Sequence, residues 1–150
     1  MESSYAKLLA SLAEARIDFV TVGGLACAMN GHVRMTEDVD ILVRREDRNL
    51  NLLLATLTGF GEGYARELSL EDFPDEEGAV RVIEEFPIDI FVRMNGHTYE
   101  SLQSNIEQLP LNDLSLPYLD IAGLLLLKKD SLREKDQIDV LALNRLLENE

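Results

Sequence analysis

The sequence is poor in cysteine and has no long apolar run, and each shortage excludes a class of protein. Its single cysteine, Cys27, allows no intrachain disulfide. Because the chain also lacks a recognisable signal peptide, we expect it to work in the reducing cytoplasm. The longest apolar run, Ile121 to Leu127, is much too short to cross a bilayer, so no membrane partner is expected.

Basic side chains are also scarce. The chain has 14 lysines and arginines against 28 aspartates and glutamates, which gives a formal net charge of -14 at pH 7. This balance argues against broad, charge-driven binding along a nucleic-acid backbone. It still leaves room for a local basic pocket, for example around Lys128, Lys129 and Arg133.

Apolar residues, in contrast, are plentiful enough for a sizeable core. The 150 residues are a typical length for one domain, and 46% of them are hydrophobic. The chain contains no internal repeat, low-complexity segment or linker that would divide it. Residues 1–150 are therefore expected to form a single domain.

The hydrophobic pattern alternates between helical and strand spacing along the chain. The expected helices are one that begins at Ser3 or Ser4 and continues to about Ala15, then 25–30, 45–61 with its closing glycines, 99–108, 121–131 and 134–147. The expected strands are 18–22, 39–43, 79–86, 87–94 and 114–120. This order predicts an α+β fold, with a small mixed β-sheet flanked by helices and a helical C-terminus.

Three aspartates stand in strands that otherwise look buried. Side chains alternate across a strand, so Asp38 and Asp40 share one face while the valines and isoleucine between them pack into the core. In a later strand, Asp89 is the lone charge among apolar residues. An ionised carboxylate in such surroundings is costly unless it is paired, and three on neighbouring strands would raise each other's pKa.

A divalent cation would remove this conflict. Mg²⁺, or Mn²⁺ in its place, takes oxygen ligands and often keeps substrate phosphates in its shell. Two such ions about 3.5–4 Å apart can clamp the attacking and leaving oxygens of a phosphoryl-type transfer. We therefore predict a metal site at these aspartates. The alternative is structural: Asp38 caps a turn, Asp40 faces solvent, and Asp89 pairs with Arg81 or Arg93.

A glycine pair, Gly23-Gly24, precedes the first two of these acids. It follows an expected strand and opens an expected short helix. Glycine lets the backbone come close to a ligand, and a helix N-terminus presents free N–H groups to anions. The pair therefore suits a triphosphate, although a glycine pair after a strand is usually only a turn.

Together these residues resemble the nucleotidyltransferase superfamily of the DNA polymerase β type. The pattern that carries the resemblance is Gly23-Gly24, then Arg34-x-Thr36-x-Asp38-x-Asp40, then Asp89. The stretch VGGLACAMNGHVRMTEDVDILV is most similar to AbiEii-like toxins and to aminoglycoside and lincosamide nucleotidyltransferases. The similarity covers residues 18–92, and Lys128 with the later REKDQID resembles the C-terminal motif of the AbiEii-like group.

The resemblance implies a nucleotidyltransferase-like fold with a catalytic core at residues 1–95 and a mainly helical part at 96–150. It implies that Asp38 and Asp40 hold the metals. Asp89 would complete the metal site and is the implied base toward the acceptor hydroxyl.

The resemblance also assigns a nucleotide-binding role to three residues. Gly23 and Gly24 would cradle the β- and γ-phosphates, and Lys128 would reach the triphosphate as a point charge. A lysine that snorkels to solvent at the end of an apolar helix explains Lys128 equally well. Many members of the superfamily carry a serine after the first glycine, where this chain has Gly24.

The remaining polar residues are expected to have structural roles. Asp136 and Asp139, on a charged C-terminal helix, are expected to face solvent or to pair with Lys135 and Arg133. Surface roles are expected for His32 and His97, a core position for Cys27, and either a phosphate contact or a structural role for Arg34 and Thr36.

Two main functions follow from these observations. The first is an enzyme that transfers a nucleoside monophosphate from an NTP to a hydroxyl of a small molecule, a protein or RNA. The acidic surface favours a small-molecule or protein acceptor. A tRNA acceptor stays possible if a local basic pocket forms. The alternative is a non-catalytic or weakly active nucleotidyltransferase-fold binding module of a toxin–antitoxin or phage-defence pair. For the enzyme, the short chain leaves little room to bind the acceptor, so a partner protein or a second copy in a homodimer is expected to complete the acceptor site. A metal-dependent phosphoesterase using the same acids is less favoured.

Overall fold

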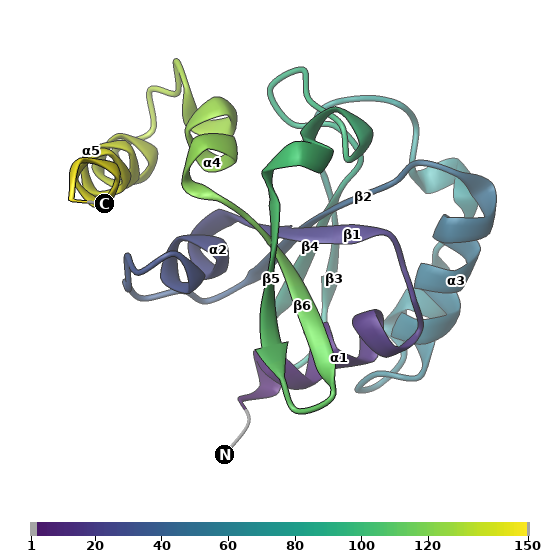
Figure 1. Ribbon diagram of the computed structural model, residues 1–150. Helices are drawn as coiled ribbons and strands as arrows, with labels where there is room; N and C mark the ends of the chain where they lie inside the picture. Colours follow the sequence, from purple (N-terminus) through teal and green to yellow (C-terminus); the bar gives the residue numbers. More distant parts are fainter. Residues whose placement is uncertain (1–2, 150) are drawn as a thin grey trace.

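The computed structural model describes residues 3–149, and its centre is a six-stranded mixed sheet. Along the sheet the strand order is β3-β4-β2-β1-β6-β5 (Figure 1). The strands are β1 (Phe19–Val22), β2 (Val39–Val43), β3 (Ala79–Ile83), β4 (Pro87–Phe91), β5 (Ile106–Leu111) and β6 (Leu114–Leu119). Strand β2 runs parallel to β4 and antiparallel to β1, and β6 runs parallel to β1.

Helices cover both faces of this sheet, as Figure 1 shows. The α-helices are α1 (Ser4–Glu14), α2 (Gly23–Met29), α3 (Asp47–Thr58), α4 (Ile121–Lys128) and α5 (Glu134–Glu148). Short 3₁₀ turns are η1 (Tyr64–Glu67), η2 (Leu70–Asp72) and η3 (Glu100–Asn105). Across residues 3–149, no helix has the length and apolar character needed to cross a membrane.

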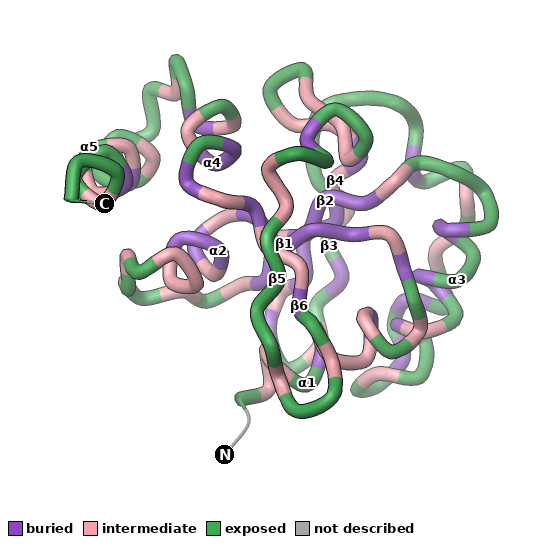
Figure 2. Tube along the Cα trace, viewed as in Figure 1, coloured by how far each residue is buried: buried purple, intermediate pink, exposed green. Residues whose placement is uncertain are grey.

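Strand alternation divides the core into two apolar clusters, one on each face of the sheet (Figure 2). Val39, Ile41 and Val43 of β2 pack in the larger cluster with the inward leucines of α1 and α3. Leu42 points to the other face and packs with α2, α4 and Leu143 of α5. The two clusters hold β2 by both faces, which fixes the direction of every side chain along it.

The predicted fold class is confirmed, because the chain forms a mixed sheet flanked by helices. The expected helix at 99–108 is wrong in its second half. It ends at Asn105, and Ile106–Leu111 forms β5, which pairs antiparallel with β6. Pro110 lies within β5, where an edge strand tolerates a missing N–H donor. The single-domain assignment and its division at residue 95 stay predictions.

Several element ends also differ from expectation. Helix α2 begins at Gly23 rather than Leu25, so the glycines belong to its first turn. Helix α4 ends at Lys128 rather than Ser131. Its start is as predicted, since the Asp120 carboxylate accepts a hydrogen bond from the Gly123 N–H at 2.7 Å.

The start of α4 presses closely against β6. A methyl group on Gly123 would lie 2.5 Å from Cγ of Leu119 and 3.0 Å from Cβ of Asn105. Leu119 is fully buried, so it has little space into which to move. This contact places α4, and with it the lysine at the helix's far end, against the sheet.

We therefore predict that Gly123→Ala destabilises the protein by about 1–3 kcal/mol, the usual cost of overpacking a core. This loss of stability is expected even though, in an isolated helix, alanine is more favourable than glycine by about 1 kcal/mol. Urea unfolding measures it. Combining the change with Leu119→Val should cost less than the two single changes added together, because the smaller side chain relieves the clash. A Gly123→Ala variant as stable as the parent would contradict this packing.

Candidate active site

The three predicted acids meet at one end of β2 and β4. The parallel register of these strands sets Asp40 directly beside Asp89, and Asp38 immediately precedes β2 on the same face. One carboxylate oxygen from each of the three residues lies within 4.8 Å of the other two. Side chains from two segments about fifty residues apart thus form one cluster.

This proximity perturbs Asp40 most. Burial, followed by the negative charges of Asp38 and Asp89, raises the pKa of Asp40 to about 7. Without a cation, the Asp40 carboxyl group therefore keeps its proton up to a pH well above the range in which an aspartate usually ionises. The cluster has the oxygen donors that Mg²⁺ and Mn²⁺ take, together with an electrostatic conflict that a cation would relieve.

An arginine from the neighbouring strand already pairs with one of the acids. Arg81 of β3 lies directly across from Asp89 and donates Nε–H and Nη2–H to its two oxygens, both at 2.8 Å. Nη2 of Arg81 is also 3.5 Å from Oδ2 of Asp38. Burial raises the pKa of Asp89, but the hydrogen bonds and charge of Arg81, together with hydrogen bonds to Asp38 and Asp40, leave that pKa below its ordinary value. The pairing with Arg81 considered from the sequence is thus present, whereas Arg93 pairs with Asp75.

The glycine pair allows the chain to pass close to these acids. Gly23 has a φ of +66°, and the Asp40 carboxylate occupies the place that a side chain at residue 23 would take. A side chain at Gly24 would meet Oγ1 of Thr36 at 2.8 Å and the guanidinium nitrogens of Arg34 at 3.0 Å. Both glycines are required by this packing. Their role toward phosphates stays a prediction.

A cleft of about 300 Å³ opens in front of the cluster. The two glycines and the three aspartates form one part of its lining. The rest of the lining brings cations near the acids, namely Arg34, Arg81, Lys128, Arg133 and Lys135. A ligand in this cleft would therefore meet both carboxylates and positive charges, and Arg81 lies directly among the acids.

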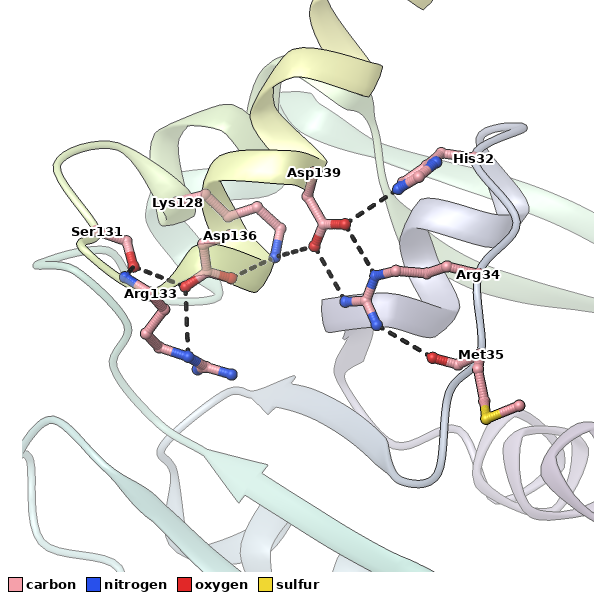
Figure 3. Close-up of polar contacts among 8 residues, drawn as sticks. All are labelled: His32, Arg34, Met35, Lys128, Ser131, Arg133, Asp136 and Asp139. Carbon is pink, nitrogen blue, oxygen red and sulfur yellow. Dashed lines mark hydrogen bonds and ion pairs between the residues drawn. The ribbon is translucent and has the colours of Figure 1, made fainter.

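Lys128 lies in the cleft wall and is held by two acids of α5 (Figure 3). Its Nζ is 2.9 Å from Oδ1 of Asp136 and 3.0 Å from Oδ2 of Asp139. Burial lowers the pKa of Lys128, but these hydrogen bonds raise it above its ordinary value. The side chain is only 9% exposed, so it does not snorkel to solvent. Whether Lys128 binds a triphosphate stays a prediction.

The expectation that Asp139 faces solvent or pairs with neighbours on its own helix is wrong. Its side chain is fully buried and accepts hydrogen bonds from Nε and Nη2 of Arg34 at 2.8 and 3.0 Å. Burial raises the pKa of Asp139, but the hydrogen bonds from Arg34 and Lys128 outweigh it and lower that pKa to about 2. Asp136 is closer to expectation, because Arg133 lies 3.7 Å from it, although Ser131 and Lys128 bind it more closely.

His32 also belongs to this network, which corrects its expected surface role. Its Nε2 is 3.1 Å from Oδ1 of Asp139, and the side chain is 17% exposed. Cys27, by contrast, is buried in the core as predicted, and burial raises the pKa of its thiol to about 11. Arg34 and Thr36 have the structural roles considered from the sequence. The Thr36 hydroxyl donates to the carbonyl of Arg34, and the Thr36 carbonyl accepts from the hydroxyl of Tyr5 at 2.9 Å.

A sequence signal for the buried acid did exist. Helical spacing places Asp139 on the same side of α5 as Leu143 and Leu146, both of which pack into the second apolar cluster. An acid on an apolar helix face requires a partner. The partner, Arg34, is more than a hundred residues away, so the pairing appears only in the fold.

The sheet topology and the acid cluster define a protein of nucleotidyltransferase-like fold. A candidate nucleotidyltransferase from Thermotoga maritima matches 97% of this chain and 85% of its own length, with a TM-score of 0.51 and 14% identity. An antigenic nucleotidyltransferase-like protein from Paracoccidioides brasiliensis matches 95% of this chain and 73% of its own, with a TM-score of 0.56 and 17% identity. At these identities the likeness establishes the fold alone. No protein-family profile and no curated protein matches the sequence.

The first prediction from this site concerns the buried acid. Asp139→Asn should destabilise the protein by about 3 kcal/mol at pH 7, because it leaves the buried Lys128 and the partly buried Arg34 undercompensated. Since the pKa in the folded state lies below the ordinary 3.8, the stabilisation by Asp139 is complete above about pH 4 and is lost as the pH falls through about 2. Urea unfolding of both proteins should therefore show a difference that shrinks over that range.

Asp75→Asn is a matched control for this experiment. It removes the same charge from an exposed pair with Arg93, where solvent screening should make the loss much smaller than for Asp139→Asn. Equal losses in the two variants would contradict the assignment of Asp139 to a buried network.

The second prediction concerns Asp40. Its folded-state pKa is raised to about 7, so its contribution to stability is complete below about pH 4 and is lost as the pH rises through 7. Asp40→Asn removes that loss and should stabilise the metal-free protein at pH 8 by at least about 2 kcal/mol. Unfolding in urea with EDTA, at pH 5 and pH 8, tests this. A variant that is less stable than the parent at pH 8 would refute the electrostatic conflict.

Proposed function

We propose that the protein is a metal-dependent nucleotidyltransferase that moves a nucleoside monophosphate from a nucleoside triphosphate to an acceptor hydroxyl. In this reaction the bond from the α-phosphorus to the bridging oxygen breaks, and a bond to the acceptor oxygen forms. Pyrophosphate leaves, and the hydroxyl proton passes to a base. The observation that carries the proposal is the meeting of three carboxylates, beside a glycine pair, in a cleft that is also lined by cations.

Asp38 and Asp40, completed by Asp89, are the residues that would hold Mg²⁺ or Mn²⁺. Three carboxylate oxygens within 4.8 Å of one another suit the ligand preference of these ions. A bound cation would supply Lewis-acid polarisation of phosphate oxygens. Asp89 is our candidate base because its carboxylate lines the cleft beside the other two acids, and the acceptor hydroxyl would replace part of its pairing with Arg81.

The glycines and cations that line the cleft are suited to the phosphates. Gly23 and Gly24 leave their backbone free of side chains near the acids, and Arg34 and Lys128 bring positive charge close to them. Lys128 would have to exchange one of its two carboxylate partners for a phosphate oxygen. The net charge of -14 favours a small-molecule or protein acceptor over RNA.

Ligand-dependent thermal stability tests nucleotide binding. A ligand that binds only the native state must raise the melting temperature. We expect at least one NTP to raise it in the presence of Mg²⁺ or Mn²⁺ and to have a much smaller effect with EDTA. No shift with any nucleotide and metal would contradict the proposal.

Transfer itself is tested with α-phosphate-labelled NTPs and with candidate small-molecule and protein acceptors. Asp40→Asn should lower label transfer by at least about a hundredfold, since even supporting residues of metal sites cost 10–100-fold in affinity or activity. The variant should remain folded, because it removes a buried charge. Asp75→Asn, which lies on the surface, should transfer as the parent does. Undiminished transfer by Asp40→Asn would exclude this metal site.

A second candidate is a binding module of a toxin–antitoxin or phage-defence pair, including one of the AbiEii-like kind. It is favoured by the internal pairing of two site residues, because Arg81 engages Asp89 and two carboxylates engage Lys128. Such a module should form a stoichiometric complex with a partner protein or a second copy. Complex formation should then be unaffected by Asp38→Asn. Loss of the complex in that variant would count against the module.

A further inference from the structure

We propose that Arg81 is a built-in counter-cation of the acid cluster, so that the cluster accepts one divalent cation, at Asp38 and Asp40, rather than two. The inference rests on the proposed function, since it concerns the same metal site. It starts from the position of Arg81 in the sheet and from its contacts with two of the three acids.

The sheet itself places the guanidinium at the cluster. Arg81 and Asp89 are direct partners in the antiparallel pairing of β3 and β4, which brings their Cβ atoms to about 5 Å. The two parallel N–H···O bonds, each 2.8 Å long, form the bidentate arrangement that is strongest between arginine and a carboxylate. Arg81 is 51% exposed, so the acids, and not tight packing, hold its guanidinium in place.

The contacts of Arg81 are unequal among the acids. Both oxygens of Asp89 accept a hydrogen bond from Arg81, whereas Asp38 is reached only at 3.5 Å. Asp40 has no hydrogen bond or ion pair to Arg81 within the described chain. Asp38 and Asp40 are therefore the main ligands available for a metal, and Asp89 can contribute only the lone pairs that Arg81 leaves free.

The net charge of the cluster also indicates a single divalent cation. Three carboxylates and one guanidinium leave two negative charges when all are ionised, and one divalent cation cancels them. A second divalent cation would leave the cluster positive and would lie beside the guanidinium, which repels it. Without Arg81, the three ionised carboxylates would carry three negative charges, and one divalent cation would leave one of them uncancelled. The cluster would then attract a second divalent cation.

Titration of Mn²⁺ into the nucleotide-free protein, with free Mn²⁺ followed by electron paramagnetic resonance, tests the inference. We expect one Mn²⁺ per chain in the parent. Arg81→Gln should bind a second Mn²⁺ and should bind the first about tenfold more tightly or better, because a neighbouring positive charge is lost. Arg81→Lys keeps the charge without the bidentate geometry, and it should still bind one.

Two controls separate charge at the cluster from charge elsewhere. Arg93→Gln removes the same charge from a surface pair with Asp75, and it should still bind one Mn²⁺. The double variant Arg81→Gln with Asp89→Asn removes both partners of the pair and should return to one. Circular dichroism verifies that each variant is folded, and Arg81→Met provides a second neutral substitution if Arg81→Gln unfolds.

The outcomes distinguish this inference from the proposed function. Two ions per chain in the parent, or one ion with unchanged affinity in Arg81→Gln, would overturn the role of Arg81 and leave the metal-dependent transfer standing. A change in Arg93→Gln equal to that in Arg81→Gln would also overturn it. If neither the parent nor any variant binds Mn²⁺, the metal-dependent function itself fails, and the inference fails with it.

Discussion

The candidate site depends on one constraint, which is the parallel pairing of β2 and β4 that brings Asp40 beside Asp89. Apolar residues on both sides of these acids hold the strands in that register, because a shift by one residue would turn valines and isoleucines toward the cleft. The carboxylates consequently cannot move apart to reduce their repulsion. Core packing thus maintains an arrangement that electrostatics alone would disfavour, as is common at functional sites.

The rest of the site compensates for that repulsion from outside. Five of the chain's 14 lysines and arginines line the cleft, although the protein as a whole is strongly acidic. Three of these cations are themselves held by acids, with Arg81 on Asp89 and both Arg34 and Lys128 on Asp139. The cleft is therefore a place where charges of both signs are fixed at short distance. A phosphate-bearing ligand with a bound cation has the same combination of charges.

Sequence reasoning succeeded where the signal was local. The alternation in Val39–Val43, the inward leucines of α3 and the cap at Asp120 all depend on spacings within one element, and each is present in the fold. It failed where distant pairing decides the outcome. Strand β5 forms because β6 offers it a partner beside β1, and Asp139 is buried because Arg34 approaches from the other end of the chain. Neither partner could be identified before the strands and helices were assembled.

The loop before β2 is gripped by helices from both halves of the chain, by α1 through Tyr5 and by α5 through Asp139. The first and last helices, α1 and α5, therefore both help to position the segment that leads into the acid cluster. This has a practical meaning for anyone attaching labels or immobilising the molecule. A probe on α1 or α5 would disturb these contacts, whereas the edge strand β5 is separated from β2 by β6 and β1 and offers a more neutral point of attachment.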